Sequence, residues 1–177
     1  MTMALLTNNT SSNQTTSSFT SSIDNTYKVY VFRFYDVNPV TDGALLTFNA
    51  STDGGSNYNV TKTSSFYRAI HNEGGSSAAL AYMTANDEAE QTAFQDIVES
   101  IGNGGDESAV GQVLLLDPSD TTFAKPFFSA TQSYHDSDYA MRGMIGGYFN
   151  TTSAINAVQF KMSSGNLDSV IKMYGVA

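Results

Sequence analysis

The sequence contains no cysteine and no tryptophan, only three prolines, and eight lysine or arginine residues against seventeen acidic ones. Without cysteine the chain has no disulfide and no thiolate for catalysis or metal binding, so extra durability must come from packing or from oligomerisation. The formal net charge of −9 disfavours direct binding of nucleic acid, because neutralising phosphates requires clustered cations. We therefore expect no nucleic-acid partner.

Long hydrophobic runs are also missing. No stretch reaches eighteen apolar residues, and the opening residues MTMALLTNN lack both the basic flank and the long apolar core of a signal peptide. These features predict a protein that is made in the cytoplasm and does not enter a membrane. With 177 residues, 41% of them hydrophobic, the chain is long enough for one packed domain and an additional arm.

Familiar catalytic and cofactor-binding motifs do not occur in the sequence. There is no Gly-x-Ser-x-Gly elbow, no phosphate-binding Gly-Lys-Ser/Thr loop and no dinucleotide fingerprint. The acidic loops GNGGDES and LDPSD lack the alternating ligand spacing of a calcium-binding loop. We therefore predict that the protein is not an enzyme and needs no cofactor or metal. A glycan hydrolase stays open only if two carboxylates face each other across a groove.

The charges that are present are unevenly distributed along the chain. Between Arg68 and Lys125 there is no lysine or arginine, whereas ten of the seventeen acidic residues fall in this interval. One interpretation is a solvated acidic surface that aids solubility, and the other is a surface that binds cations or docks a basic neighbour.

Most of the remaining sequence has the two-residue period of β-strands. In YKVYVFRFYDV, residues 27–37, aromatic and β-branched side chains occupy both faces, which predicts a central strand. Clusters of Gly, Asn, Asp and Ser separate it from further strand-like segments. These segments are ALLTFNAS, YNVTKTSSFYRAI, AALAYMT, VGQVLLLDP, KPFFSATQSY and GGYFNTT.

One segment has a different period. Between Asn86 and Gly102, apolar residues recur at spacings of three and four, which predicts an amphipathic helix. Asn86 is suited to cap its N-terminus, acidic residues follow in the first turn, and Gly102 is suited to end it. The apolar residues concerned are Ala89, Ala93, Phe94, Ile97, Val98 and Ile101.

The C-terminal residues predict a β-hairpin. Val158, Phe160 and Met162 alternate with polar or small residues, Ser163–Asn166 turn the chain, and the alternation resumes at Leu167. Eight or nine short strands with one inserted helix favour two packed antiparallel sheets. We predict an antiparallel β-sandwich of the jelly-roll type over residues 23–177.

Residues 1–22 predict a separate, extended polar arm. In residues 7–22, fifteen of sixteen are Ser, Thr, Asn or Gln, so the segment cannot bury enough surface to offset roughly 1–2 kcal/mol of ordering entropy per residue. We expect a neighbouring molecule to order it through strand pairing, with Leu5, Leu6, Phe19 and Ile23 contacting the partner. The alternative is that its own domain, or a neighbour in a crystal, orders it.

Aromatic residues are abundant, with ten Tyr and eleven Phe. They fit a core and interface role, and the alternative is a platform for a carbohydrate. The loop SYHDSDY, with Tyr134, His135 and Asp136, contains candidate residues for glycan binding. The pairing of His135 with Asp136 and Asp138 also leaves an ordinary surface loop or an ion site open.

Three stretches resemble virion structural proteins of tailed bacteriophages, particularly marine ones. They are STDGGSNYN, NGGDESAVGQVLLLDPS and GYFNTTSAINAVQFKMSSGNLDSVIKMYGVA, and the resemblance spans most of residues 23–177. It implies a β-sandwich that is used in tail fibres or as a head decoration, without a catalytic signature. Relatives in that group often have longer chains.

The resemblance implies a location in the virion and a mechanical function. Our leading hypothesis is a capsid decoration, or cement, protein, a trimer whose arm docks on neighbouring major capsid subunits and adds binding free energy across their boundaries. The alternative is a tail fibre or receptor-binding module that recognises a bacterial surface glycan. Trimerisation rests on the resemblance alone, since other closed symmetries would also bury aromatic residues.

Overall fold

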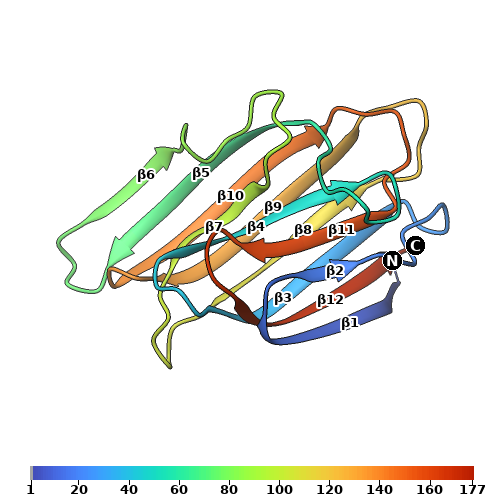
Figure 1. The fold of residues 1–177 in the computed structure, drawn as a ribbon. Coiled ribbons are helices and arrows are strands. Elements are labelled where there is room, and N and C mark those ends of the chain that lie inside the picture. Colours follow the sequence, from blue (N-terminus) through green and yellow to red (C-terminus); the bar gives the residue numbers. More distant parts are fainter. Residues whose placement is uncertain (1) are drawn as a thin grey trace.

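The computed structural model describes residues 2–177 and shows an all-β, antiparallel protein (Figure 1). Over this range there is no helix that could cross a membrane. The twelve strands are β1 (Met3–Gln14), β2 (Ser17–Phe19), β3 (Val29–Pro39), β4 (Ala44–Ser51), β5 (Lys62–Asn72), β6 (Ala78–Tyr82), β7 (Gln95–Ile101), β8 (Ala109–Leu116), β9 (Lys125–His135), β10 (Tyr139–Phe149), β11 (Ala157–Met162) and β12 (Leu167–Val176).

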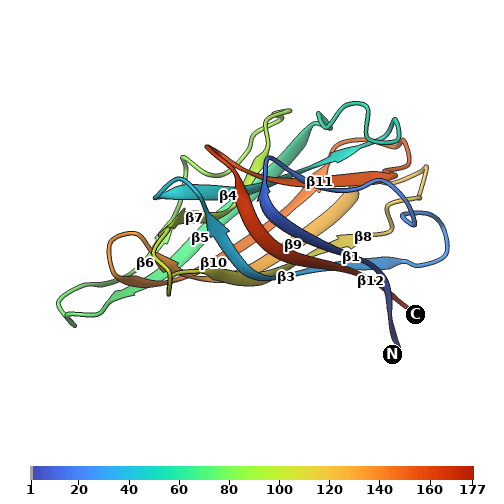
Figure 2. The same ribbon diagram turned by 60° about the horizontal axis from the view of Figure 1, so that its bottom comes forward.

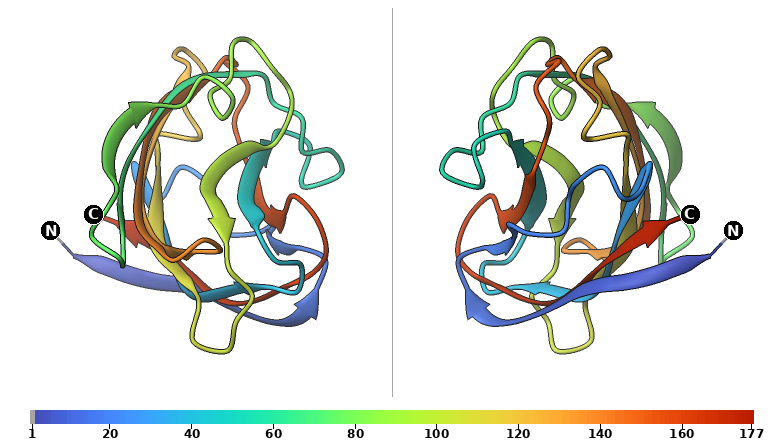
Figure 3. Two further views of the ribbon diagram at one scale, coloured as in Figure 1. Left: turned by 90° about the vertical axis from the view of Figure 1, so that its left-hand side faces the viewer. Right: turned by 90° about the vertical axis from the view of Figure 1, so that its right-hand side faces the viewer.

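All twelve strands belong to one sheet. A continuous path runs in the order β1-β12-β3-β8-β9-β7-β4-β11-β2, and at β9 the sheet branches into β10, β5 and β6. The path curls until its two ends meet, where the Asn9 side chain of β1 donates a 2.9 Å hydrogen bond to the carbonyl of Ser18 in β2. The end-on views in Figure 3 show the strands arranged around an enclosed interior.

An aromatic cluster fills this interior. Phe160 of β11 contacts four other phenylalanine rings at centroid distances of 5.6–6.5 Å, and those rings lie on opposite sides of the curl. Each of the five rings is at most 2% exposed. Edge-to-face and offset contacts at these distances are favourable beyond the area they bury. The four partners are Phe19, Phe32, Phe34 and Phe48.

The prediction of a helix between Asn86 and Gly102 is wrong. Residues 95–101 form β7, and the residues before it form a loop held to β5 by backbone hydrogen bonds between Lys62 and Gln91. The apolar residues of β7 depart from the two-residue alternation of a strand because the register between β4 and β7 shifts twice, and Ser100 has a positive φ of 38°. This irregularity lets the adjacent Ile97 and Val98 both be fully buried.

The expected jelly-roll sandwich is also not supported. A sandwich requires two separate sheets, whereas here β7 pairs with β4 and reaches β9 through Ile101 and His135. The hydrogen-bonded path is therefore continuous around the core. The coarser expectation of an all-β antiparallel protein is confirmed. The predicted C-terminal hairpin is wrong: β11 and β12 flank the turn at residues 163–166, but β11 pairs with β4 and β2, whereas β12 pairs with β3 and β1.

The N-terminal segment does not need another molecule to order it. β1 pairs with β12 over most of its length, and β2 pairs with β11, as Figure 2 shows for β1 beside β12. The hydroxyl- and amide-rich side chains are compatible with this because the backbone supplies the pairing. The idea of a free arm at residues 1–22 is corrected for the described part: residues 3–19 contribute two strands to the same sheet.

Replacing Phe160 by alanine should lower the free energy of unfolding by about 3–5 kcal/mol, because the cavity would lie where both sides of the curl meet. Chemical denaturation followed by circular dichroism measures this change. Phe128→Ala is the matched control, since that ring is 52% exposed, and its cost should stay below about 1 kcal/mol. Equal costs for the two variants would contradict the assignment of the core.

Removing residues 1–22 should prevent cooperative folding, because it deletes β1, β2 and the buried Phe19 and exposes the β12 edge. Calorimetry and circular dichroism of the truncated chain measure the outcome. A truncated chain that still melts cooperatively within a few degrees of the full chain would show that the segment is a separate arm.

Candidate functional site

The side of the sheet that faces away from the core collects exposed apolar side chains. Twelve large hydrophobic residues within 2–177 are exposed, and ten of them point outward from the strands β6-β5-β10-β9-β8-β3-β12-β1. The other two, Val40 and Phe123, lie outside this surface. The ten are Met3, Leu5, Tyr35, Tyr67, Leu80, Tyr82, Val110, Phe128, Met144 and Tyr148.

Strand register arranges these residues in rows across the sheet. We call the surface made by these rows the outer face. One row contains Tyr82, Tyr67, Met144, Ala130, Gln112, Arg33, Lys172 and Asn8, and the next contains Ser65, Gly146, Phe128, Leu114, Val31, Tyr174 and Leu5. The row beside that of Phe128 contains Thr63, Tyr148, Pro126, Leu116, Val29, Val176 and Met3. The row beside that of Met144 contains Leu80, Ala69, Arg142, Gln132, Val110, Tyr35, Val170 and Thr10.

The charge of the outer face differs from that of the rest of the molecule. The residues of its four rows include three cations, Arg33, Arg142 and Lys172, and no acid. The exposed Asp36 borders the last row, because it shares with Tyr35 the bulge opposite Val110. Because the whole chain has a net charge of −9, the remainder has a net charge of −12. The concentration of acids in the interval between Arg68 and Lys125 therefore does not extend onto this face.

Two shallow hollows on the outer face join into one groove. The first, about 390 Å³, lies over β5, β10, β9 and β8, with Tyr67, Phe128 and Met144 among its lining residues. The second, about 290 Å³, lies over β3, β8, β12 and the start of β1. Gln112 and Leu114 line both hollows.

This surface has the composition of a protein interface. Aromatic residues, methionine and arginine are enriched in interfaces, whereas acidic residues are depleted from their centres. Apolar surface of this extent is rare on a monomer that has no partner. A glycan site would instead need several convergent polar groups, and the groove offers chiefly Gln112 and a few hydroxyls.

The residues expected to contact a partner from the arm have different environments. Leu5 is 55% exposed and belongs to the outer face, so its expected role stays a prediction. Leu6 packs against the core at a register shift in β1. Phe19 and Ile23 are buried in the core of their own domain, so their side chains cannot insert into a neighbouring molecule. For Phe19 and Ile23 the expectation is corrected, whereas for Leu6, which is only partly buried, it stays a prediction.

The expected glycan-binding residues lie together where β9 meets β10. The hydroxyl of Tyr134 lies 3.0 Å from Glu73 and 3.2 Å from Asp138, and these carboxylates raise the pKa of the phenol. The Nδ1 atom of His135 lies 2.6 Å from the carboxylate of Asp136. Tyr134 and His135 are half-buried and already engaged with their neighbours. The glycan role of these residues stays a prediction.

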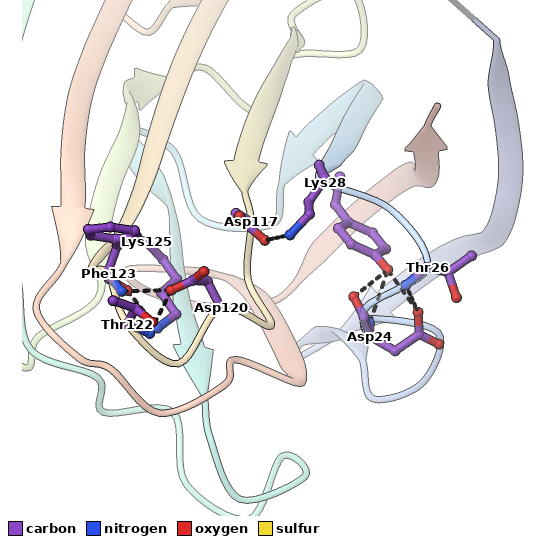
Figure 4. Close-up of polar contacts among 9 residues, drawn as sticks. Asp24, Thr26, Lys28, Asp117, Asp120, Thr122, Phe123 and Lys125 are labelled. Atoms are coloured by element: carbon purple, nitrogen blue, oxygen red, sulfur yellow. Dashed lines mark hydrogen bonds and ion pairs between the residues drawn. The ribbon is translucent and has the colours of Figure 1, made fainter.

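At the opposite end of β9 the acidic side chains fix turns (Figure 4). Asp120 accepts hydrogen bonds of 2.6 and 2.7 Å from the amides of Thr122 and Phe123, which lower its pKa. Asp24 accepts a bond from the amide of Thr26, and its pKa is lowered by hydrogen bonding to Thr26. These acids therefore have a local structural role.

Two lysines are fully buried on either side of Phe149, which pairs with both. Lys62 donates to the carbonyl of Ala93, and burial lowers its pKa to about 8. Lys125 donates to the carbonyls of Phe123 and Thr151 at 2.9 and 3.0 Å, and burial lowers its pKa as well.

Lowered lysine pKa values often mark catalytic groups. Here both amines are enclosed and bonded to carbonyls of loops, so we assign them to holding the 83–94 and 117–124 connections. No cluster of potential metal ligands occurs within residues 2–177. Comparison of the chain with known protein families, with curated proteins and with solved structures gave no match.

Sequence reasoning missed most of the outer face. It read the aromatic excess as core or interface, but did not assign Tyr67, Phe128 or Met144 to one surface. The available signal was the strand at 27–37, whose apolar residues occupy both faces. Assembling the surface required the register between β5, β10, β9 and β8.

Burial of Lys62 should make the protein more stable as the pH rises from about 8 to 9.5. The unfolded lysine keeps its proton up to its ordinary pKa of 10.5, whereas the folded one loses it near 8, so raising the pH in this interval favours folding. Urea denaturation at several pH values measures the slope. Lys62→Met should keep only the smaller rise that Lys125 contributes, and an unchanged slope would contradict the assignment.

Proposed function

We propose that the protein is a non-enzymatic structural subunit of a bacteriophage virion and that it attaches to neighbouring subunits through its outer face. The observation that carries the proposal is this face itself, which is broad and largely apolar and has one acid, Asp36, at its border in a chain of net charge −9. The sequence resemblance to virion structural proteins supports the same class of function. The leading form of the proposal is a capsid decoration protein bound to major capsid subunits.

The mode of attachment differs from the one expected from the sequence. Because β1 and β2 are strands of the domain, binding through a free arm has lost its support. The outer face offers rigid strands in its place, so little conformational entropy is lost on binding. Its three cations match an apolar partner surface that has a few acidic groups at its rim.

A tail fibre or receptor-binding module is the second candidate. It is favoured by the gathering of Tyr134, Glu73, Asp138 and His135 around the β9–β10 turn, since aromatic rings beside carboxylates are common in glycan sites. The number of copies per particle separates the two forms, because hundreds of copies indicate the head and a few dozen or fewer indicate the tail.

A single negative charge introduced among the apolar residues of the outer face should prevent attachment. Phe128→Asp places a carboxylate in the centre of the groove, where docking would desolvate it, so the number of subunits bound to particles that lack the protein should fall at least about tenfold. Quantitative mass spectrometry of sedimented particles measures the bound copies.

Phe123→Asp is the matched control, because that ring is 71% exposed and lies outside the outer face. It should bind like the unmodified chain. If Phe128→Asp bound equally well, the outer face would not be the attachment surface. If Phe128→Asp bound normally and Tyr134→Ala lost binding to host cells, the glycan-recognition form of the proposal would replace the capsid decoration form.

A further inference from the structure

Strand β6 forms an unprotected edge of the sheet. It pairs with β5 on one side only, over residues 78–82, and Figures 1 and 3 show it at the outer limit of the sheet, away from the closed part. Its sequence, AALAY, has no charge and no proline, and Leu80 is 76% exposed. Proteins that stay monomeric normally protect such an edge with charges, prolines or bulges.

The free side of β6 presents a defined set of backbone groups. The amide of Asn72 donates to Ser77, and the amide of Met83 donates to Phe66, so the odd-numbered residues of this strand bond to β5. In an antiparallel ladder the intervening residues direct their N–H and C=O groups the other way. Ala78, Leu80 and Tyr82 therefore present three donors and three acceptors to the free side.

The opposite end of the sheet is protected. β1 has two shifts in its register with β12, and β2 lies beside it, bonded through the Asn9 side chain. Bulges of this kind twist an edge away from new partners. β6 has a continuous register with β5, and no strand within residues 2–177 pairs with its free side.

We propose that β6 binds the β6 strand of a second copy of this chain, antiparallel and about a two-fold axis at Leu80. In this register Leu80 faces its own equivalent, and Ala78 faces Tyr82 of the other copy. The three free donors and acceptors of each strand then form six backbone hydrogen bonds. This is strand addition in which each copy serves as both template and added strand.

Side chains and charge fit a second copy. The bulky Tyr82 would lie beside the small Ala78, and the two exposed Leu80 side chains would cover each other. Because the strand itself is uncharged, no like charges face each other within the paired strands. The carboxylate of Asp87 lies at the border of the strand, where it accepts a hydrogen bond of 2.5 Å from the hydroxyl of Tyr82. The outer faces of the two copies would become continuous. The inference does not depend on the proposed function.

A cysteine at position 80 tests the register directly, since the chain has no other thiol. In a hydrogen-bonded pair the two Cα atoms lie about 5.5 Å apart, within the range of a disulfide. Leu80→Cys should therefore form a covalent dimer under mild oxidation. Ala78→Cys is the matched control, because its two copies would lie about 13 Å apart along the strands and should cross-link at least tenfold more slowly.

Light scattering after size exclusion tests the association without cross-linking. The unmodified chain should be a dimer, and Leu80→Pro should raise the dissociation constant at least tenfold. Proline is tolerated where an edge N–H faces solvent, so the monomer should keep its circular dichroism spectrum and melting temperature. A monomeric or trimeric unmodified chain, or equal cross-linking from positions 78 and 80, would overturn the proposal.

Discussion

The packing of phenylalanine rings around Phe160 is the constraint on which the rest of the structure depends. Phe160 touches rings from strands on opposite sides of the curl, so the sheet must bend around it until its ends meet. Residues 2–177 contain neither a disulfide nor a metal cluster, so the fold rests on burial of apolar side chains, among which the aromatic rings are the largest. Side chains alternate along a strand, so enclosing one face of the sheet fixes which residues point outward.

The outer face follows from that constraint, yet it is more apolar than a solvent-facing side needs to be. Phe128, Met144 and Tyr67 lie in adjacent rows without any acid among them. The acids lie instead in loops and turns, where several accept backbone amides, as Asp120 does. This separation of charge from apolar surface gives the molecule a face suited to contact and an acidic remainder suited to water.

The two ends of the sheet show how similar strands can differ in their surroundings. β1 is polar and uncharged, and it is fixed within the domain by β12 and by its contact with β2. β6 is apolar and uncharged, and only β5 holds it. A polar sequence was therefore a poor indicator of disorder in this chain, because backbone pairing supplied what its side chains could not.

The sequence by itself determined the all-β character, the central strand at 27–37 and the two C-terminal strands with the turn between them, because these depend on local alternation and turn residues. The pairing of those two strands as a hairpin was predicted and is wrong, since each pairs with other strands. It also indicated an acidic protein with few cations. Only the tertiary structure decided that Gln95–Ile101 is a strand and not a helix. A register shift there buries the adjacent residues Ile97 and Val98 together, which breaks the alternation by which a strand is recognised in a sequence. Likewise, the outer face and the position of residues 3–19 depend on which strands pair, and pairing between distant segments leaves no local mark on the sequence.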